Sequence, residues 1–321
     1  MNCCRPSSQW LIVCFGVESG SWHWESNRVS INTPCVRVFL VVFLFTVQAM
    51  AGDPIRLTHD GKRKISPVYM PDGESIAFSV HDVPNRVVIK RLNPEDGSQT
   101  PLFPKDDAHQ FDAAFSPDGR YRAYCRSASV RQLVLVIRDT QDNDREITFL
   151  PPGSSRSTVR SLVFTPDNSR IVFTLSGTGG LQLASLNTRG EDLKHLTQSE
   201  GTNYWPSISP DGGKIAFSSS RNGAYDIYVM DADGGSVQRL THSPTRDVRP
   251  KWSPDGRQIA FTSARDGNYE VYVMNADGSN LRRATNHPDR DDFPTWQPDG
   301  RKLLTVAERD GRSDLYVIDV P

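Results

Sequence analysis

A Pro-Asp pair followed by Gly or Asn recurs six times in this chain at nearly constant spacing, and no other feature limits the possible folds as strongly. The intervals between successive aspartates are 46, 49, 44, 44 and 44 residues. The six aspartates are Asp72, Asp118, Asp167, Asp211, Asp255 and Asp299. Proline presets the turn, aspartate accepts hydrogen bonds from its own backbone, and the following glycine, or Asn168 in one copy, accepts a positive φ. Each pair therefore predicts a tight hairpin.

Four strand patterns surround each hairpin, and they are clearest in residues 250–285. One pattern leads into the turn at 250–253, a second leaves it at 258–262, and a third alternates with period two over 269–274. After a second turn, residues 281–285 end the unit. Four short strands per unit is the content of one propeller blade, whereas the helical periodicity of ankyrin or tetratricopeptide arrays is lacking.

The ends of the repeat region predict how the ring closes. The sixth unit stops at Pro321 without a fourth strand, whereas residues 55–58 precede the first unit and match the fourth-strand pattern. We therefore predict an all-β fold, a six-bladed β-propeller of four-stranded antiparallel blades in which the N-terminal strand completes the last blade and protects its edge. Cys125 is the single cysteine of this region, so we expect a buried thiol and no internal disulfide.

Residues 1–51 form a leader ahead of the repeats. An apolar run at 38–47 follows Arg37 and precedes Ala49-Met50-Ala51, which is the order typical of a secretory signal peptide. We therefore expect a mature chain of residues 52–321 that is periplasmic or secreted and has no transmembrane segment. The residues upstream of the run indicate a start site assigned too early; the alternatives are a long signal peptide and an ordered N-terminal extension.

The repeat unit resembles the WD40-like Pro-Asp repeat of the TolB-like β-propeller family. The resemblance is carried by the pattern L-T, P-x-W-S-P-D-G, I-A-F and Y-V-M-x-A-D-G, which residues 205–319 match most closely. The third unit departs from it at Asn168 and in the glycine-rich residues 177–180. The resemblance implies the propeller fold and leaves the ligand open. The N-terminal α/β domain that precedes the propeller in TolB is lacking, which puts a role in a Tol-type system in doubt.

Polar residues gather in the loops between the predicted blades, on the face where propellers usually meet their ligands. They are His59, His109, His242 and His287 with Asp60, Asp106, Asp107, Asp247, Asp289, Asp291 and Asp292. They predict a polar rim around the channel that holds a cation or contacts a partner; a solvated surface is the alternative. No tight metal-ligand spacing occurs among them, so we predict neither a metal nor a cofactor.

Tryptophans and arginines supply the other candidates. Trp252 and Trp296 are expected to pack between blades, whereas Trp205 stands three residues earlier in its own unit and is a candidate for contact with a ligand. Arg221, Arg265 and Arg309 recur in one register after the second strand of their units. We predict that they link neighbouring blades, Arg221 through Asp247 and Arg265 through Asp291; an arginine patch for an acidic ligand is the alternative.

The balance of 37 basic and 38 acidic residues argues against a nucleic-acid partner. No G-x-S-x-G elbow, phosphate loop or dinucleotide fingerprint occurs, and no catalytic residue is predicted. The sequence therefore favours a monomeric, non-catalytic module that binds a protein or a cell-envelope component through its loop face. The alternative is a carbohydrate lyase or hydrolase that works in the channel with the loop histidines and a metal.

Overall fold

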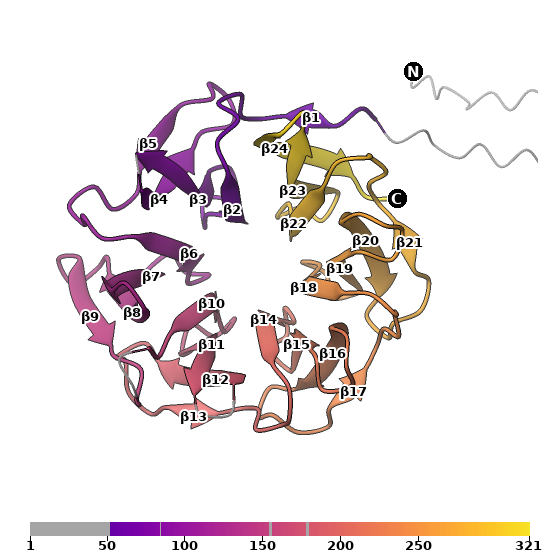
Figure 1. The fold of residues 1–321 in the computed structure, drawn as a ribbon. Helices are drawn as coiled ribbons and strands as arrows, with labels where there is room; N and C mark the ends of the chain where they lie inside the picture. Colours follow the sequence, from indigo (N-terminus) through magenta and orange to yellow (C-terminus); the bar gives the residue numbers. More distant parts are fainter. Residues whose placement is uncertain (1–51, 84, 154–155, 178–179) are drawn as a thin grey trace, which may run out of the picture. The chain divides into compact units, whose positions relative to one another are not determined.

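The computed structural model describes residues 52–83, 85–153, 156–177 and 180–321, and their regular elements are all β-strands. The strands form six four-stranded antiparallel sheets, which are arranged as the blades of a ring (Figure 1). The predicted six-bladed propeller is confirmed. The predicted leader and its cleavage site lie outside the described residues.

The blades follow one another along the chain, and each begins with its innermost strand. Blade 1 consists of β2 (Lys64–Tyr69), β3 (Ile76–Val83), β4 (Arg86–Leu92) and β5 (Gln99–Pro101). Blade 2 consists of β6 (Gln110–Phe115), β7 (Tyr121–Ser129), β8 (Gln132–Asp139) and β9 (Arg145–Phe149). Blade 3 consists of β10 (Val159–Phe164), β11 (Arg170–Gly177), β12 (Gly180–Asn187) and β13 (Lys194–His195).

The other three blades repeat this order, and the last borrows a strand from the N-terminal end of the ring. Blade 4 consists of β14 (Asn203–Ile208), β15 (Lys214–Ser219), β16 (Asp226–Asp231) and β17 (Gln238–Arg239). Blade 5 consists of β18 (Asp247–Trp252), β19 (Gln258–Ser263), β20 (Glu270–Asn275) and β21 (Arg282–Arg283). Blade 6 consists of β22 (Asp291–Trp296), β23 (Lys302–Arg309), β24 (Arg312–Asp319) and β1 (Ile55–Arg56).

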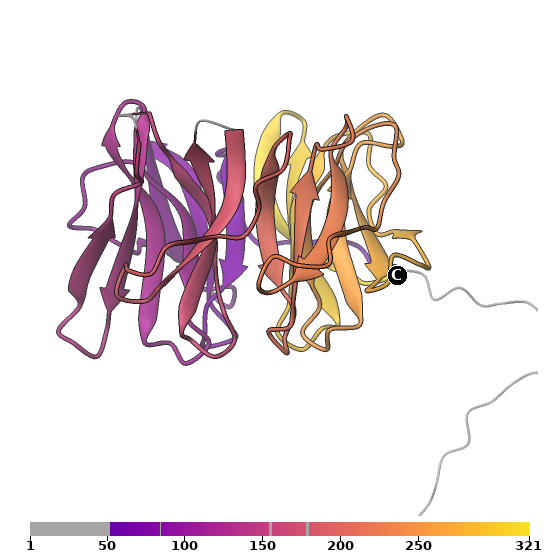
Figure 2. The same ribbon diagram turned by 90° about the horizontal axis from the view of Figure 1, so that it is seen from below.

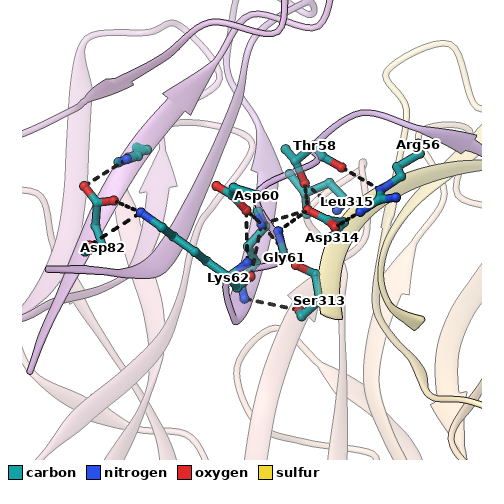
Figure 3. Close-up of polar contacts among 11 residues, drawn as sticks. Arg56, Thr58, Asp60, Gly61, Lys62, Asp82, Ser313, Asp314 and Leu315 are labelled. Carbon is teal, nitrogen blue, oxygen red and sulfur yellow. Dashed lines mark hydrogen bonds and ion pairs between the residues drawn. The ribbon is translucent and has the colours of Figure 1, made fainter. Parts of the chain in front are cut away.

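The ring closes as predicted, because β1 pairs antiparallel with β24 in the register Ile55↔Val317. The buried carboxylate of Asp314 accepts hydrogen bonds from Thr58 Oγ1 at 2.7 Å and Arg56 Nη2 at 2.6 Å (Figure 3). Lys64 of blade 1 reaches the same carboxylate, with its Nζ 3.1 Å from Oδ1. Closure therefore combines strand pairing with a buried polar network that joins the two ends of the ring.

An arrangement of one acidic residue, one arginine and one threonine like that around Asp314 recurs inside the ring. In blade 4, Asp226 accepts hydrogen bonds from Arg239 and Thr241. In blade 5, Glu270 accepts them from Arg283 and Thr285. Residues 56 and 58 therefore take the places that these pairs occupy in blades 4 and 5, although they come from the other end of the propeller sequence.

The Pro-Asp turns have the predicted geometry. Gly73 has a φ of 74° and Asn168 a φ of 61°, so Asn168 fills the left-handed position that glycine fills elsewhere. In the fifth turn, Asp255 Oδ1 accepts hydrogen bonds from Arg257 N at 3.1 Å and from Ser253 Oγ at 2.6 Å. These aspartates stabilise the turns, as predicted.

The hydrophobic core lies within and between the blades. The residue six places after the turn aspartate is a fully buried aromatic in five blades, namely Phe78, Tyr124, Phe173, Phe217 and Phe261. Cys125 packs in the cluster shared by blades 2 and 3, and burial raises the pKa of its thiol well above the usual value. It is the buried structural thiol that the sequence predicts.

The strands run between two faces of the ring (Figure 2). We call the face that carries the inter-blade loops and the loops between the second and third strands the loop face. The opposite face, which carries the Pro-Asp turns, is called the turn face. Each innermost strand begins near the loop face and ends at its Pro-Asp turn, so its residues line the channel in order from one face to the other.

Candidate functional site

Each innermost strand carries a bulge at the same place, where its pairing with the second strand shifts register. One residue at each bulge has a positive φ between 51° and 58°. These six bulge residues are Ser66, Asp112, Ser161, Trp205, Arg249 and Phe293. A bulge re-aims a side chain, and a left-handed conformation costs a non-glycine residue about 1–3 kcal/mol. All six line one cavity, so the bulges direct them into the channel.

Two cavities follow each other along the channel. The channel cavity, of about 170 Å³, is lined by the six bulge residues and extends toward the turn face along Lys251, Phe115, Pro117 and Phe164. The mouth cavity, of about 350 Å³, lies at the loop-face end of blades 6 and 1 and is lined by Arg63, Arg290, Asp292, Glu308 and neighbours. Arg249 and Phe293 line both cavities and therefore lie between them.

Arg249 lies between two aromatic rings from the neighbouring blades. Its guanidinium carbon is 4.5 Å from the ring centroid of Trp205 and 4.1 Å from that of Phe293, distances at which cation–π attraction operates. Its Nη1 donates to Asp292 Oδ1 at 3.1 Å. Burial lowers the pKa of Arg249, yet a guanidinium stays charged in proteins. One cation thus joins blades 4, 5 and 6 in mid-channel.

Asp292 is shared by two arginines. Besides Arg249, the side chain of Arg290 contacts it, with Nε 3.0 Å from Oδ2, and Arg290 also lies over the ring of Tyr269 at 4.5 Å. Thr262 Oγ1 donates to the same carboxylate at 2.9 Å. A single negative charge therefore faces two positive charges, which leaves the mouth cavity with an excess of positive charge at this point.

Asp112 joins three blades on the opposite side of the channel. Its carboxylate accepts hydrogen bonds from Ser66 Oγ of blade 1 at 2.8 Å, and from Arg160 Nε at 2.5 Å and Ser161 N at 2.9 Å, both of blade 3. Burial alone would raise the pKa of Asp112, but the charge and hydrogen bonds of Arg160 lower it below its usual value. Asp112 is therefore an ionised carboxylate whose bonds are made within the protein.

The predicted histidines are not brought together around the channel. His59 and His242 are exposed and follow the outermost strands β1 and β17. His109 Nδ1 accepts a hydrogen bond from Val87 N at 3.2 Å, and His287 Nδ1 accepts one from Asp289 N at 3.0 Å. Neither the channel cavity nor the mouth cavity is lined by any of the four. Their contact with a partner stays a prediction.

Over the described parts of the chain, no group of three or more His, Cys, Asp and Glu side chains is placed to hold a metal ion. The described residues also contain no helix long and apolar enough to cross a membrane.

The predicted pairing of the arginines was wrong. Arg265 Nη2 bonds Asp247 Oδ2 at 2.8 Å, and both residues belong to blade 5 rather than to neighbouring blades. Antiparallel pairing causes this, because Asp247 begins the innermost strand directly opposite Ser263, where the second strand ends. Asp247 is fully buried, and its carboxylate is already paired with Arg265 of its own blade.

The other two arginines follow the same rule. Arg309 Nη1 lies 2.8 Å from Asp291 Oδ1 in blade 6, and Arg221 Nη2 donates to Asn203 Oδ1 at 3.0 Å in blade 4. Each arginine also lies over an aromatic ring of its own blade, as Arg221 does over Tyr228 at 4.9 Å. These arginines connect the first and second strands of one blade and bridge no two blades.

Blade 6 lacks one hydrogen bond of this arrangement, which gives a testable prediction. Ser263 Oγ donates to Asp247 at 2.6 Å, but the residue opposite Asp291 is Ala307. Burial raises the pKa of Asp291 more than Arg309 lowers it, so the contribution of Asp291 to stability is highest at low pH and is lost as pH rises through this raised pKa. We expect Ala307→Ser to add about 1 kcal/mol to the free energy of unfolding at pH 7.

Urea unfolding at pH 7 and at pH 3 measures this effect, which should be smaller at the lower pH because a protonated Asp291 needs the donor less. Ser263→Ala in blade 5 is the matched control and should destabilise the protein at pH 7. No gain from Ala307→Ser at pH 7, with Ser263→Ala destabilising, would contradict this account of Asp291.

The predicted packing of Trp252 and Trp296 between blades is confirmed, whereas the contact of Trp205 with a ligand stays a prediction. Trp296 is 6% exposed and its Nε1 donates to Lys251 O of the neighbouring blade at 2.8 Å, and Trp252 packs against the cluster of blades 4 and 5. Trp205 lies at a bulge in the channel. The sequence reasoning missed the other five bulge residues. Their shared place, six residues before each turn aspartate, is the signal that could have found them.

Comparisons with known proteins agree with the fold. Residues 91–251 match the TolB beta propeller domain, and residues 237–320 match the N-terminal beta propeller domain of Tricorn protease. The comparison with curated proteins gave no match.

Solved structures with this fold include TolB proteins. A protein described as TolB from Agrobacterium tumefaciens is 23% identical with a TM-score of 0.56, over 70% of this chain and 92% of that one. TolB from Acinetobacter baumannii is 21% identical with a TM-score of 0.60, over 77% of this chain and 64% of that one. An oligogalacturonate lyase from Vibrio parahaemolyticus is 15% identical with a TM-score of 0.55, over 83% of this chain and 93% of that one.

Identities this low show the fold alone. The family-model match, however, spans half of the sequence and lies on the Pro-Asp repeats themselves, whose turns, strands and ring closure the structure shows in detail. This chain belongs to the TolB β-propeller domain family.

Proposed function

We propose that the protein is a monomeric, non-catalytic binding module that captures another protein or a cell-envelope component on its loop face. The contact is centred on the mouth cavity, and the captured surface is acidic. The predicted leader and the membership of the TolB propeller family support export to the periplasm or secretion. A ligand-binding face with fixed walls suits this fold, because loops on a rigid scaffold commonly carry function.

The observation that carries the proposal is the unbalanced charge of the mouth cavity. Lys64 is buried and already paired with Asp60 and Asp314, so it offers no free charge. The other charged lining residues are the cations Arg63, Arg249 and Arg290 and the anions Asp292 and Glu308. A concave surface with an excess of one sign focuses the field and attracts the opposite charge. An acidic partner segment therefore fits this mouth.

Arg63 is the residue best placed to meet a partner. Its side chain is exposed at the mouth and forms no hydrogen bond or ion pair with the described part of the chain. Its backbone oxygen accepts a bond from His81 N at 3.4 Å, which a side-chain substitution leaves in place. Arg63→Glu therefore changes the charge of the mouth without breaking the ring.

Capture from an envelope extract by the immobilised protein tests the proposal. We expect Arg63→Glu to reduce the captured partner about tenfold or more and to reduce the sensitivity of capture to salt, because attraction becomes repulsion. Arg257→Glu is the matched control, since Arg257 is an 86% exposed side chain on the turn face. Capture that is lost equally in both variants, or in neither, would contradict a site at the mouth.

No arrangement of the described residues favours the alternative of a channel-based carbohydrate lyase or hydrolase, for which the loop histidines would have to converge. The likeness to an oligogalacturonate lyase is a likeness of fold.

A further inference from the structure

We propose that the channel cavity is a second binding site, which takes a small monocarboxylate carrying one apolar ring. This site is separate from the loop-face contact, because it lies on the turn-face side of Arg249 and Phe293. Its features are a cation without an ion-pair partner, a carboxylate whose two oxygens already accept hydrogen bonds from the protein, and an apolar wall of the right size for one ring.

The unpaired cation is Lys251, which stands two residues closer to the turn face than Arg249 on β18. Its side chain lines the cavity, and Nζ has no hydrogen-bond or ion-pair partner among the described residues. Burial lowers the pKa of Lys251 more than the charge of Asp112 raises it, so the charged form of Lys251 is only partly compensated in the free protein. An anion in the cavity would supply the missing charge.

Arg249 supplies a second donor at the inner end of the cavity. Its Nη1 is committed to Asp292, whereas Nη2 bonds no described residue and Arg249 lines the cavity. Two donors from one strand, an ammonium and a guanidinium terminus, suit the two oxygens of a carboxylate. Trp205 and Phe293 hold the guanidinium from both sides, so its position is fixed before a ligand arrives.

Asp112, which faces the same cavity, determines that the ligand has no ammonium group. Its Oδ1 accepts from Ser66 and Arg160, and its Oδ2 accepts from Arg160 and Ser161 N, so both oxygens are fully engaged. Asp112 is 4% exposed and paired with a cation. It therefore offers no site for an amine, and a simple acid is favoured over an amino acid.

The apolar wall determines the rest of the ligand. Phe115, Pro117, Phe164 and Pro294 line the cavity beside Lys251. The volume of about 170 Å³ exceeds the roughly 150 Å³ of an apolar cavity that holds one benzene molecule. A single ring with a carboxylate on it, or on a one-carbon arm, matches both this size and the polar end formed by Lys251 and Arg249.

Calorimetric titration of the purified protein with benzoate and phenylacetate tests the proposal. We expect both acids to bind and benzylamine and phenylalanine not to bind, because Asp112 has no free acceptor. N-acetylphenylalanine tests whether the carboxyl end of a peptide chain also enters the cavity. Binding would show that the site accepts the C-terminal residue of a peptide as well, and no binding would restrict the site to small free acids. Sulfate should not compete, because it has no ring.

Lys251→Met should weaken benzoate binding at least tenfold, and Lys251→Arg should keep most of it. Lys251→Met removes a partly buried charge that has no hydrogen-bond or ion-pair partner among the described residues. The variant is therefore expected to remain folded, which its circular dichroism verifies. No binding of either acid, binding that Lys251→Met leaves unchanged, or equal binding of benzylamine would overturn the proposal. Lys251→Met should leave partner capture on the loop face intact, so the two proposals can fail independently.

Discussion

Deletion of residues 54–58 is expected to lower the free energy of unfolding by about 3–5 kcal/mol. The deletion removes β1 and exposes the edge of β24, which otherwise pairs through Ile55 and Arg56. It also leaves the buried carboxylate of Asp314 without the donors Thr58 and Arg56. Thermal and urea unfolding of the protein with and without the deletion measure the loss.

A matched change inside the ring separates closure from the polar network. Arg56→Ala with Thr58→Val removes the donors to Asp314 but keeps the strand, and Arg283→Ala with Thr285→Val does the same in blade 5. We expect these two double variants to lose similar amounts and the deletion to lose more than either. A deletion variant with unchanged melting temperature would refute the role of β1 in closing the ring.

Asp112→Ala is expected to lower the free energy of unfolding by about 3–5 kcal/mol at pH 7, because it leaves Arg160 partly buried without its partner. The pKa of Asp112 is lowered in the folded state. Its contribution is therefore present above the unfolded pKa of about 3.9 and is lost as pH falls through the folded pKa. The variant should lose less stability than the parent protein between about pH 4 and pH 2.

The double variant Asp112→Ala with Arg160→Met tests whether the uncompensated charge is the cause. We expect it to be more stable than Asp112→Ala alone, since replacing both members of a buried pair costs less than removing one. Urea unfolding of the parent protein, the two single variants and the double variant gives the coupling energy. A coupling energy near zero would show that the pair does not join blades 2 and 3.

The sequence determined those features of the fold that depend on neighbouring residues or on the number of repeats. Hairpins follow from Pro, Asp and Gly or Asn in consecutive positions, which is why the left-handed conformation of Asn168 could be predicted from its neighbours alone. Strands follow from period-two alternation, and the number of blades follows from counting turns. Closure followed from a strand missing at one end and left over at the other, and pairing of β1 with β24 confirmed it.

Only the tertiary structure decided which side chains meet. The channel is lined by six residues that share a register but no chemistry, as Ser66, Asp112 and Trp205 illustrate. Their direction is set by a bulge in each innermost strand, which a residue pattern does not record. The same is true of Arg265: the sequence placed Asp247 and Asp291 in equivalent loops, but antiparallel pairing within the blade brings Asp247 to it. Contacts across strands depend on register in space, which is why the sequence could name these residues and not their partners.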